Sequence, residues 1–151
     1  MGALPDKQST TAVILASGLG LRMGGADKGL QLFNSMALAQ YAPVRLAPQV
    51  DSVIINANRN LKTYEAFGVP VFSGDNALGE FAGPLAGVIT TLQNCKTPYL
   101  LTVPSDAPLF PADLAARLTT ALMTDDADMA GAARLNQPAR ETFLARSRYS
   151  V

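Results

Sequence analysis

Residues 11–32 read TAVILASGLGLRMGGADKGLQL, and the rest of the fold is organised around this stretch. Its apolar start, residues 13–15, is short and β-branched, which predicts a strand buried on both faces at the centre of a parallel sheet. Glycines follow, and glycine permits positive φ and close backbone approach, so that successive N–H groups can converge on an anion. Arg22 and Lys28 add two cations. The stretch therefore predicts a phosphate-binding loop at the carboxyl end of the first strand.

Two common phosphate loops do not fit this spacing. A P-loop requires Gly-Lys followed by Ser or Thr, but Lys28 stands between Asp27 and Gly29. A dinucleotide-binding fingerprint requires G-x-G-x-x-G, and Gly24 comes one residue too late for it. The alternative to a phosphate loop is a glycine-rich turn with solvated charges.

The composition limits the class of protein. The chain has 151 residues, 48% of them hydrophobic and 16% charged, which is typical of a single globular domain. Twelve basic and twelve acidic residues give no net charge, which argues against a nucleic-acid partner. A lone cysteine, Cys95, cannot form an intrachain disulfide. No apolar stretch is long enough for a signal or membrane segment, so we expect a cytoplasmic protein with no membrane partner.

The chain contains no histidine, and this excludes several mechanisms. Ser-His-Asp hydrolysis, histidine-ligated zinc and imidazole general base catalysis all require that residue. Catalysis must then depend on positioning and charge neutralisation. That chemistry favours phosphoryl or nucleotidyl transfer.

Apolar strands alternate with helical segments along the chain. This order predicts a three-layer α/β fold with a mostly parallel sheet covered on both faces. Residues 1–10 are expected to be a disordered lead-in, and residues 11–151 a single domain. In the helix expected at residues 36–47, the buried side is formed by Leu38, Tyr41, Val44 and Leu46, and Pro43 predicts a kink or a later start. Further strands are expected at residues 53–56, 69–72, 99–103 and 128–132, and further helices at residues 60–68, 85–93 and 111–123.

Polar residues follow three of the expected strands, where parallel α/β sheets bind ligands. Asp106 lies between two prolines and is a candidate magnesium ligand, because magnesium is commonly held by one or two carboxylates plus phosphate oxygens. The alternative is an aspartate that caps the next helix. Asn56 could read a base edge or ribose through its amide, or could be a simple turn residue. Asp75 lies in a third such loop.

Four motifs resemble those of the molybdenum cofactor guanylyltransferase family. LASGLGLRMGGADKGL is similar to the family pattern L-A-G-G-x-x-x-R-M-G-x-D-K, with Ser17 where the family usually has glycine. P-S-D-A-P resembles the segment with the metal-binding aspartate, I-N-A-N-R a nucleotide-contacting segment, and G-P-L-A-G at residues 83–87 a further motif. The resemblance implies a Rossmann-like nucleotidyltransferase fold. It also implies a magnesium-dependent enzyme that transfers GMP from GTP to molybdopterin, or to its molybdenum-bearing form, with release of pyrophosphate.

The resemblance also implies a set of site residues. Gly74 competes with Asp75 for one nucleotide-contacting position, because the length of that loop differs from the usual pattern. The implied catalytic residues are Arg22, Lys28 and Asp106, and Asp106 is the implied metal ligand. The implied nucleotide-binding residues are Leu15, Ala16, Ser17, Gly18, Lys28, Asn56, Asp75 and Asp106.

The resemblance covers roughly residues 11–128. Beyond Gln137 the chain reads PARETFLARSRYSV, unlike the family, so the C-terminal part is expected to be incomplete. An apolar face left bare in this way would favour self-association. Three alternatives stay open: a cytidylyltransferase for the same cofactor, a sugar-phosphate nucleotidyltransferase, and a nucleotide-binding protein that is inactive without those segments.

Overall fold

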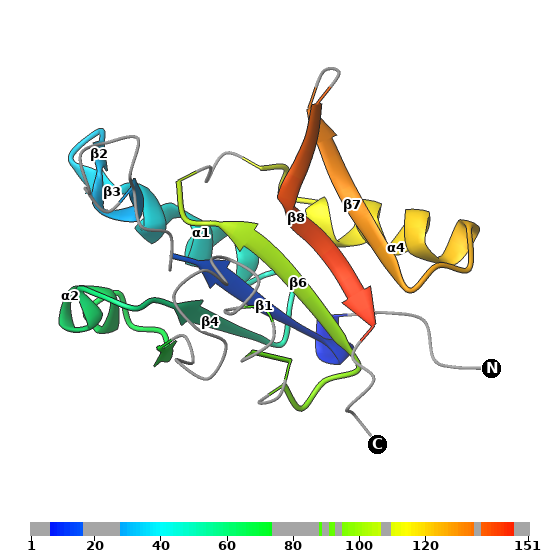
Figure 1. Cartoon of the computed structure of the whole chain (residues 1–151), viewed down its shortest axis with the longest axis horizontal. Helices are drawn as coiled ribbons and strands as arrows, with labels where there is room; N and C mark the ends of the chain where they lie inside the picture. The colour runs from blue at the N-terminus through cyan, green and yellow to red at the C-terminus, as the bar shows by residue number, and fades with distance from the viewer. Residues whose placement is uncertain are drawn as a thin grey trace.

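The computed structural model describes residues 7–16, 28–73, 88, 91–92, 95–106, 110–134 and 137–146. A six-stranded sheet with the order β5-β4-β1-β6-β8-β7 forms the centre of the molecule (Figure 1). The glycine-rich loop at residues 17–27, the segment 74–87 with its G-P-L-A-G motif, and residues 107–109 lie outside the described residues.

Four neighbouring strands of the sheet are parallel. They are β1 (Thr10–Leu15), β4 (Ser52–Asn56), β5 (Val71–Phe72) and β6 (Tyr99–Pro104). β1 pairs in parallel with β4 on one side and β6 on the other, and all six of its residues are buried. This confirms the expected central strand, since an apolar, β-branched run suits a position with neighbours on every side.

The other side of the sheet is antiparallel. β8 (Gln137–Arg146) lies between β6 and β7 (Met129–Arg134) and is antiparallel to both. The strand expected at residues 128–132 is present as β7, whereas β8 was missed. The sequence of β8 is interrupted by charges and a proline, so it lacks the apolar run that identified the other strands. The residues from Gln137 to Arg146 therefore form the strand between β6 and β7.

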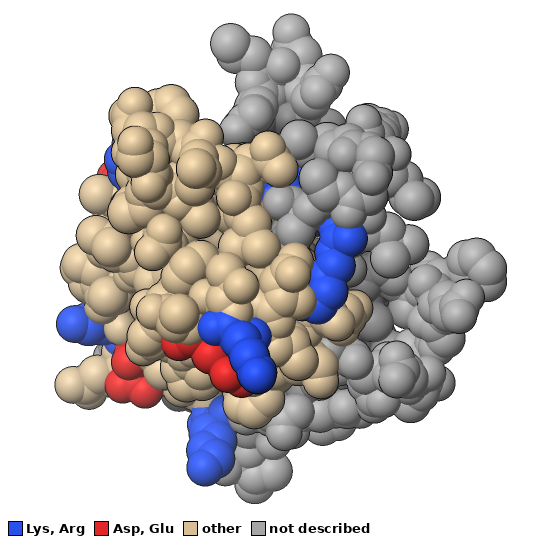
Figure 2. Space-filling view, turned by 90° about the vertical axis from the view of Figure 1, so that its left-hand side faces the viewer, with Lys and Arg blue, Asp and Glu red and all other residues tan. Residues whose placement is uncertain are grey.

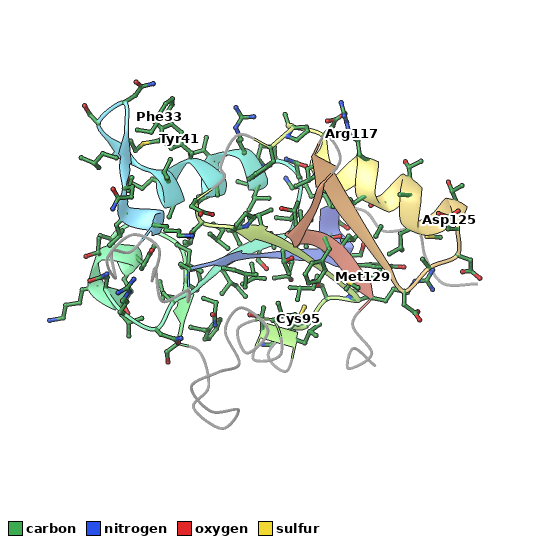
Figure 3. All side chains as sticks on the ribbon, turned by 45° about the horizontal axis from the view of Figure 1, so that its top comes forward. Phe33, Tyr41, Cys95, Arg117, Asp125 and Met129 are labelled. Atoms are coloured by element: carbon green, nitrogen blue, oxygen red, sulfur yellow. The ribbon has the colours of Figure 1, made fainter. Side chains whose placement is uncertain are left out.

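Side chains pack on both faces of the sheet, as expected for a three-layer fold. Alternate residues of β1 point to opposite faces: Ala12 and Ile14 pack with α1 (Leu38–Leu46) and α4 (Leu114–Thr124). Val13 and Leu15 pack on the other face with Val88 and Cys95, and Figure 3 shows Cys95 on the opposite side of the sheet from α4.

Helix α1 differs from the expectation at both its start and its buried face. A hairpin of β2 (Leu32–Phe33) and β3 (Met36–Ala37) takes up the first expected helical residues, so the helix starts at Leu38. Val44, expected inside, is 72% exposed. The buried residues of this helix are Ala39, Ala42 and Leu46.

The hairpin contacts α1 through aromatic side chains. The rings of Phe33 and Tyr41 pack edge to face with centroids 6.0 Å apart (Figure 3), and the Tyr41 hydroxyl donates a hydrogen bond to the Phe33 carbonyl. The two turn residues, Asn34 and Ser35, both have positive φ, which is the backbone of a two-residue hairpin turn of type I′.

Two further differences concern short segments. Lys7–Ser9 forms a 3-10 helix and Thr10 already belongs to β1, so the described secondary structure begins within the expected lead-in. Helix α2 (Leu61–Glu65) is shorter than expected. Gly68 follows it with a φ of 85°, a conformation that glycine adopts without strain. In the part of the chain that the structure describes, no helix has the length and apolar character needed to span a membrane.

Candidate functional site

Three predicted site segments meet at the carboxyl edge of the parallel strands. Leu15, the last residue of β1, is in register with Asn56 of β4 on one side and with Pro104 of β6 on the other. The Ala16 amide donates to the Asn56 carbonyl at 2.8 Å, and the Ser105 amide donates to the Leu15 carbonyl at 3.1 Å. The backbone ladder thus continues one residue past the strand ends and fixes the positions of Leu15 and Ala16 between the other two segments.

Lys28 and Asp106 come together at this edge. Lys28 opens the 3-10 helix η3 (Lys28–Leu30), and Asp106 lies in the turn after β6. The Lys28 Nζ is 3.9 Å from the Asp106 Oδ2, and the two side chains are 41% and 38% exposed. Because both charges reach solvent, this pair adds at most about 1 kcal/mol to stability. The pair matters because it places one cation and one carboxylate side by side, both accessible from solvent.

Asn56 is the most unusual polar residue of the site. Its side chain is fully buried, and neither the amide nitrogen nor the amide oxygen has a hydrogen-bond partner among the described residues. Leaving a buried polar group unpaired costs roughly 1–3 kcal/mol. Native structures rarely retain such a group without a reason, so an amide unpaired among the described residues makes Asn56 a candidate for contact with a ligand.

The remaining predicted site residues lie outside the described part of the chain. These are Ser17, Gly18 and Arg22 of the glycine-rich loop, and Gly74 and Asp75 of the loop after β5. Of the predicted set, the structure therefore places Leu15, Ala16, Lys28, Asn56 and Asp106, and it brings all five to one edge of the sheet.

Sequence reasoning missed the buried residues beneath this edge. Tyr64 of α2 is fully buried and Ser105 is 6% exposed, and Gly29 packs against both. A tyrosine on a short polar helix and a serine beside a candidate ligand give no signal in a single sequence. The motif D-K-G-L did contain Gly29, but its spacing alone could not show which side chains lie over it.

The described charges suit a small anionic ligand whose charge is partly neutralised by a metal ion. Among the described residues, no three Asp, Glu or Cys side chains gather as a complete metal site. A single accessible carboxylate is sufficient for magnesium when substrate phosphates supply other ligands. Asp106 is an accessible carboxylate of this kind, and the Lys28 ammonium lies beside it.

Figure 2 shows the face of the molecule at the left of Figure 1, where β1 and β4 end. Over the described part of this face, Lys and Arg side chains stand apart from one another, and some lie beside acidic side chains (Figure 2). A continuous basic surface of the kind that binds nucleic acid is not seen there.

Comparison with known proteins identifies the family. The model of the MobA-like NTP transferase domain matches residues 12–150. The chain belongs to this family. The family match continues through β8, which corrects the expectation that the resemblance ends near residue 128.

Individual relatives agree with this family of nucleotidyltransferases. The chain is 58% identical over 128 residues to a molybdenum cofactor guanylyltransferase of Acidovorax sp. (strain JS42), covering 85% of this chain and 60% of the relative. A protein with the same name from Ralstonia nicotianae is 61% identical over 112 residues, covering 74% of this chain and 54% of the relative. The chain spans about 60% of the length of the curated relatives that it matches.

A solved structure shows the same fold at low sequence identity. The molybdopterin-guanine dinucleotide biosynthesis protein A of Archaeoglobus fulgidus superimposes with a TM-score of 0.68 at 14% identity. The superposition covers 91% of this chain and 67% of that protein. The predicted fold class, a three-layer α/β nucleotidyltransferase fold with a mostly parallel sheet, is thus confirmed by the strand pairing and by this likeness.

Proposed function

We propose that this chain transfers GMP from GTP to molybdopterin, or to its molybdenum-bearing form, and releases pyrophosphate. The structural support is the unpaired Asn56 amide on the same sheet edge as Lys28 and Asp106. A nucleotide has groups that could pair with these side chains: a base or ribose has donors and acceptors for the Asn56 amide, and phosphates suit the Lys28 cation. The choice of guanine and of the pterin acceptor is supported by the names of relatives that are 58% and 61% identical.

The proposed reaction is an in-line displacement at the α-phosphorus of GTP. An oxygen of the terminal phosphate of the pterin forms a new bond to that phosphorus, while the bond from the α-phosphorus to the oxygen bridging to the β-phosphate breaks. The electron pair of the broken bond leaves with pyrophosphate. Lys28, and Arg22 in the glycine-rich loop, would neutralise the charge that develops on this leaving group, so their effect is greater in the transition state than in the ground state.

Asp106 is the residue proposed to hold Mg²⁺. When bound, the ion polarises phosphate oxygens and neutralises their charge. The Lys28 ammonium lies 3.9 Å from the Asp106 carboxylate, so both groups could contact the phosphates of one nucleotide. Asn56 would orient the nucleoside from the neighbouring strand end, where its backbone is fixed by the hydrogen bond from Ala16.

The direct test is pyrophosphate release measured with GTP and with CTP, each with and without molybdopterin, in the presence of Mg²⁺. We expect release with GTP only when molybdopterin is present. Release with CTP in place of GTP would assign the chain to the cytidylyl class. Binding of GTP without any release would leave a nucleotide-binding protein and overturn the proposed transfer.

A further inference from the structure

Gly29 is held against two hydroxyl-bearing side chains directly beneath the Lys28–Asp106 pair. A Cβ atom added at Gly29 would lie 2.6 Å from the Tyr64 hydroxyl, and 2.9 Å from both the Cβ and the Oγ of Ser105. All three separations are shorter than real Cβ contacts. Gly68 has a positive φ and Gly29 does not, so glycine is required at position 29 for space and not for its backbone conformation.

Neither neighbour of Gly29 can move aside easily. Tyr64 is fully buried, and its ring packs edge to face on Phe67 with centroids 5.6 Å apart. Ser105 is 6% exposed, and its backbone amide is hydrogen-bonded to the Leu15 carbonyl. Protein interiors transmit such displacements because they are close-packed. A side chain at position 29 would therefore push η3 away from the turn after β6.

This contact connects the elements that carry the site. Gly29 directly follows Lys28, and Ser105 directly precedes Asp106. Tyr64 belongs to α2, the helix that follows β4 and its terminal residue Asn56. Lys28 and Asp106 are themselves 41% and 38% exposed, and an exposed ion pair is too weak to fix its own geometry. The buried contact below them supplies the constraint that the charges lack.

We propose that Gly29, Tyr64 and Ser105 are positioning residues, whose contact sets the separation of Lys28 from Asp106 and thereby the affinity for a magnesium–nucleoside triphosphate complex. This inference rests on the proposed function for the identity of the ligand. The spacing itself is a property of the protein without ligand. The positioning role and the proposed function can therefore be tested separately.

The test compares Gly29→Ala with a matched control, Gly131→Ala. At Gly131 an added Cβ would meet the Thr142 carbonyl oxygen at 4.0 Å, an ordinary contact. In the ligand-free proteins, we expect the backbone amide resonance of Asp106, which is far from position 29 along the chain, to shift in Gly29→Ala and to stay in place in Gly131→Ala. By calorimetry with GTP and Mg²⁺, we expect Gly29→Ala to bind on the order of tenfold more weakly, and Gly131→Ala to bind like the wild type.

A rescue variant separates positioning from a general loss of structure. Tyr64→Phe removes the hydroxyl and Ser105→Gly removes both the Cβ and the Oγ, so the triple variant with Gly29→Ala has room for the new methyl group. We expect its GTP affinity to return to that of the Tyr64→Phe/Ser105→Gly protein. Urea unfolding identifies variants that are simply unfolded, and affinities are compared on the folded fraction.

The outcomes distinguish this inference from the proposed function. An unchanged Asp106 resonance together with unchanged GTP affinity in a folded Gly29→Ala protein would overturn the positioning role and leave the proposed function standing. If the Asp106 resonance shifts in Gly29→Ala but the wild-type protein does not bind GTP, the positioning role is supported and GTP is excluded as the ligand of the site. Failure of the triple variant to recover would show that space at position 29 is not the controlling factor.

Discussion

The polar groups at the two ends of the central strand β1 differ in whether they have hydrogen-bond partners. At the amino end, the Thr11 hydroxyl lies 2.7 Å from the Thr97 hydroxyl and 3.3 Å from that of Ser52. Thr97 also donates to the Tyr99 carbonyl at 2.9 Å. At the carboxyl end, beside Leu15, the buried Asn56 amide has no partner among the described residues.

This difference predicts that the amino-end hydroxyls support the fold and that the Asn56 amide is available to a ligand. The amino-end hydroxyls satisfy one another, so they stabilise the strand pairing without outside help. The carboxyl-end amide is unpaired among the described residues, and a bound group would offset the cost of leaving it so. Substitutions at the carboxyl end of the strand should therefore reduce function, and substitutions at the amino end should reduce stability. Four predictions test this separation.

The largest effect is expected for Asp106→Ala. Losing the proposed metal ligand should lower metal-dependent GMP transfer by at least ~10³-fold, more than the loss of a single charge-stabilising donor. The free energy of unfolding should stay within about 1 kcal/mol of the wild type, since the Asp106 side chain is 38% exposed and its ion pair is weak. Pyrophosphate release and urea unfolding measure the two quantities, with Asp113→Ala as a control in the distant α4 pair. Wild-type activity in Asp106→Ala would remove this residue from the site.

Lys28→Ala and Arg22→Ala should each reduce the rate of transfer by ~10²–10³-fold, because each removes one charge that stabilises the leaving pyrophosphate. Arg117→Ala is the matched control. Arg117 is also an exposed cation, with its Nε 2.9 Å from the Asp113 carboxylate, but it lies on α4 (Figure 3). Steady-state kinetics should show a larger change in kcat than in KM for the two site variants. Equal activity in all three proteins would return Lys28 and Arg22 to the status of solvated surface charges.

A pair of substitutions tests the two ends of β1 directly. Asn56→Leu replaces the unpaired amide by an apolar group of similar size, and should raise the free energy of unfolding by about 1–3 kcal/mol while weakening GTP binding. Thr11→Val removes a paired hydroxyl, and should lower the free energy of unfolding by about 1 kcal/mol without affecting GTP binding. Urea unfolding and calorimetry provide both readouts. If Asn56→Leu destabilised the protein as much as Thr11→Val does, the contrast between the two ends would not exist.

The smallest effect is expected for Ser35→Gly in the β2–β3 turn. Ser35 has a φ of 67°, a left-handed conformation that costs a residue with a Cβ about 1 kcal/mol. Glycine is favoured there in a type I′ turn, so the substitution should stabilise the protein by up to about 1 kcal/mol. GTP affinity should be unchanged, which would show that stability can be gained near the carboxyl edge without loss of binding. A drop in affinity would instead implicate the hairpin in the site.

The sequence predicted those parts of the fold whose pattern is local. Strand β1 and strand β6 are apolar runs with several β-branched residues, and both lie where they were expected. Lys28, Asn56 and Asp106 could be grouped at one sheet edge because parallel strands end on the same side. The substrate class came from the family signature, because hydrophobic periodicity carries no information about substrates.

What the sequence did not predict depends on tertiary contacts. β8 was missed because its place between β6 and β7 is fixed by long-range pairing and not by an apolar run. Val44 was placed inside because the large side chains of this segment were assigned to the buried face, whereas the residues that pack inside include the small Ala39 and Ala42. The hairpin before the helix could not be recognised from Asn34 and Ser35 without glycine. The Gly29 contact with Tyr64 and Ser105 joins three separate segments, so only the folded chain reveals it.

The position of β8 also constrains the order in which the protein can assemble during synthesis. β6 and β7 leave the ribosome before β8, yet β8 must enter between them. Until residues 137–146 have been made, β6 presents an unpaired edge next to a β7 that has no strand to pair with. An open edge of this kind is a site for pairing with other chains. The newly made protein should therefore depend on chaperones during this interval, and a released chain that ends before residue 137 should be captured by them more readily than the 151-residue chain.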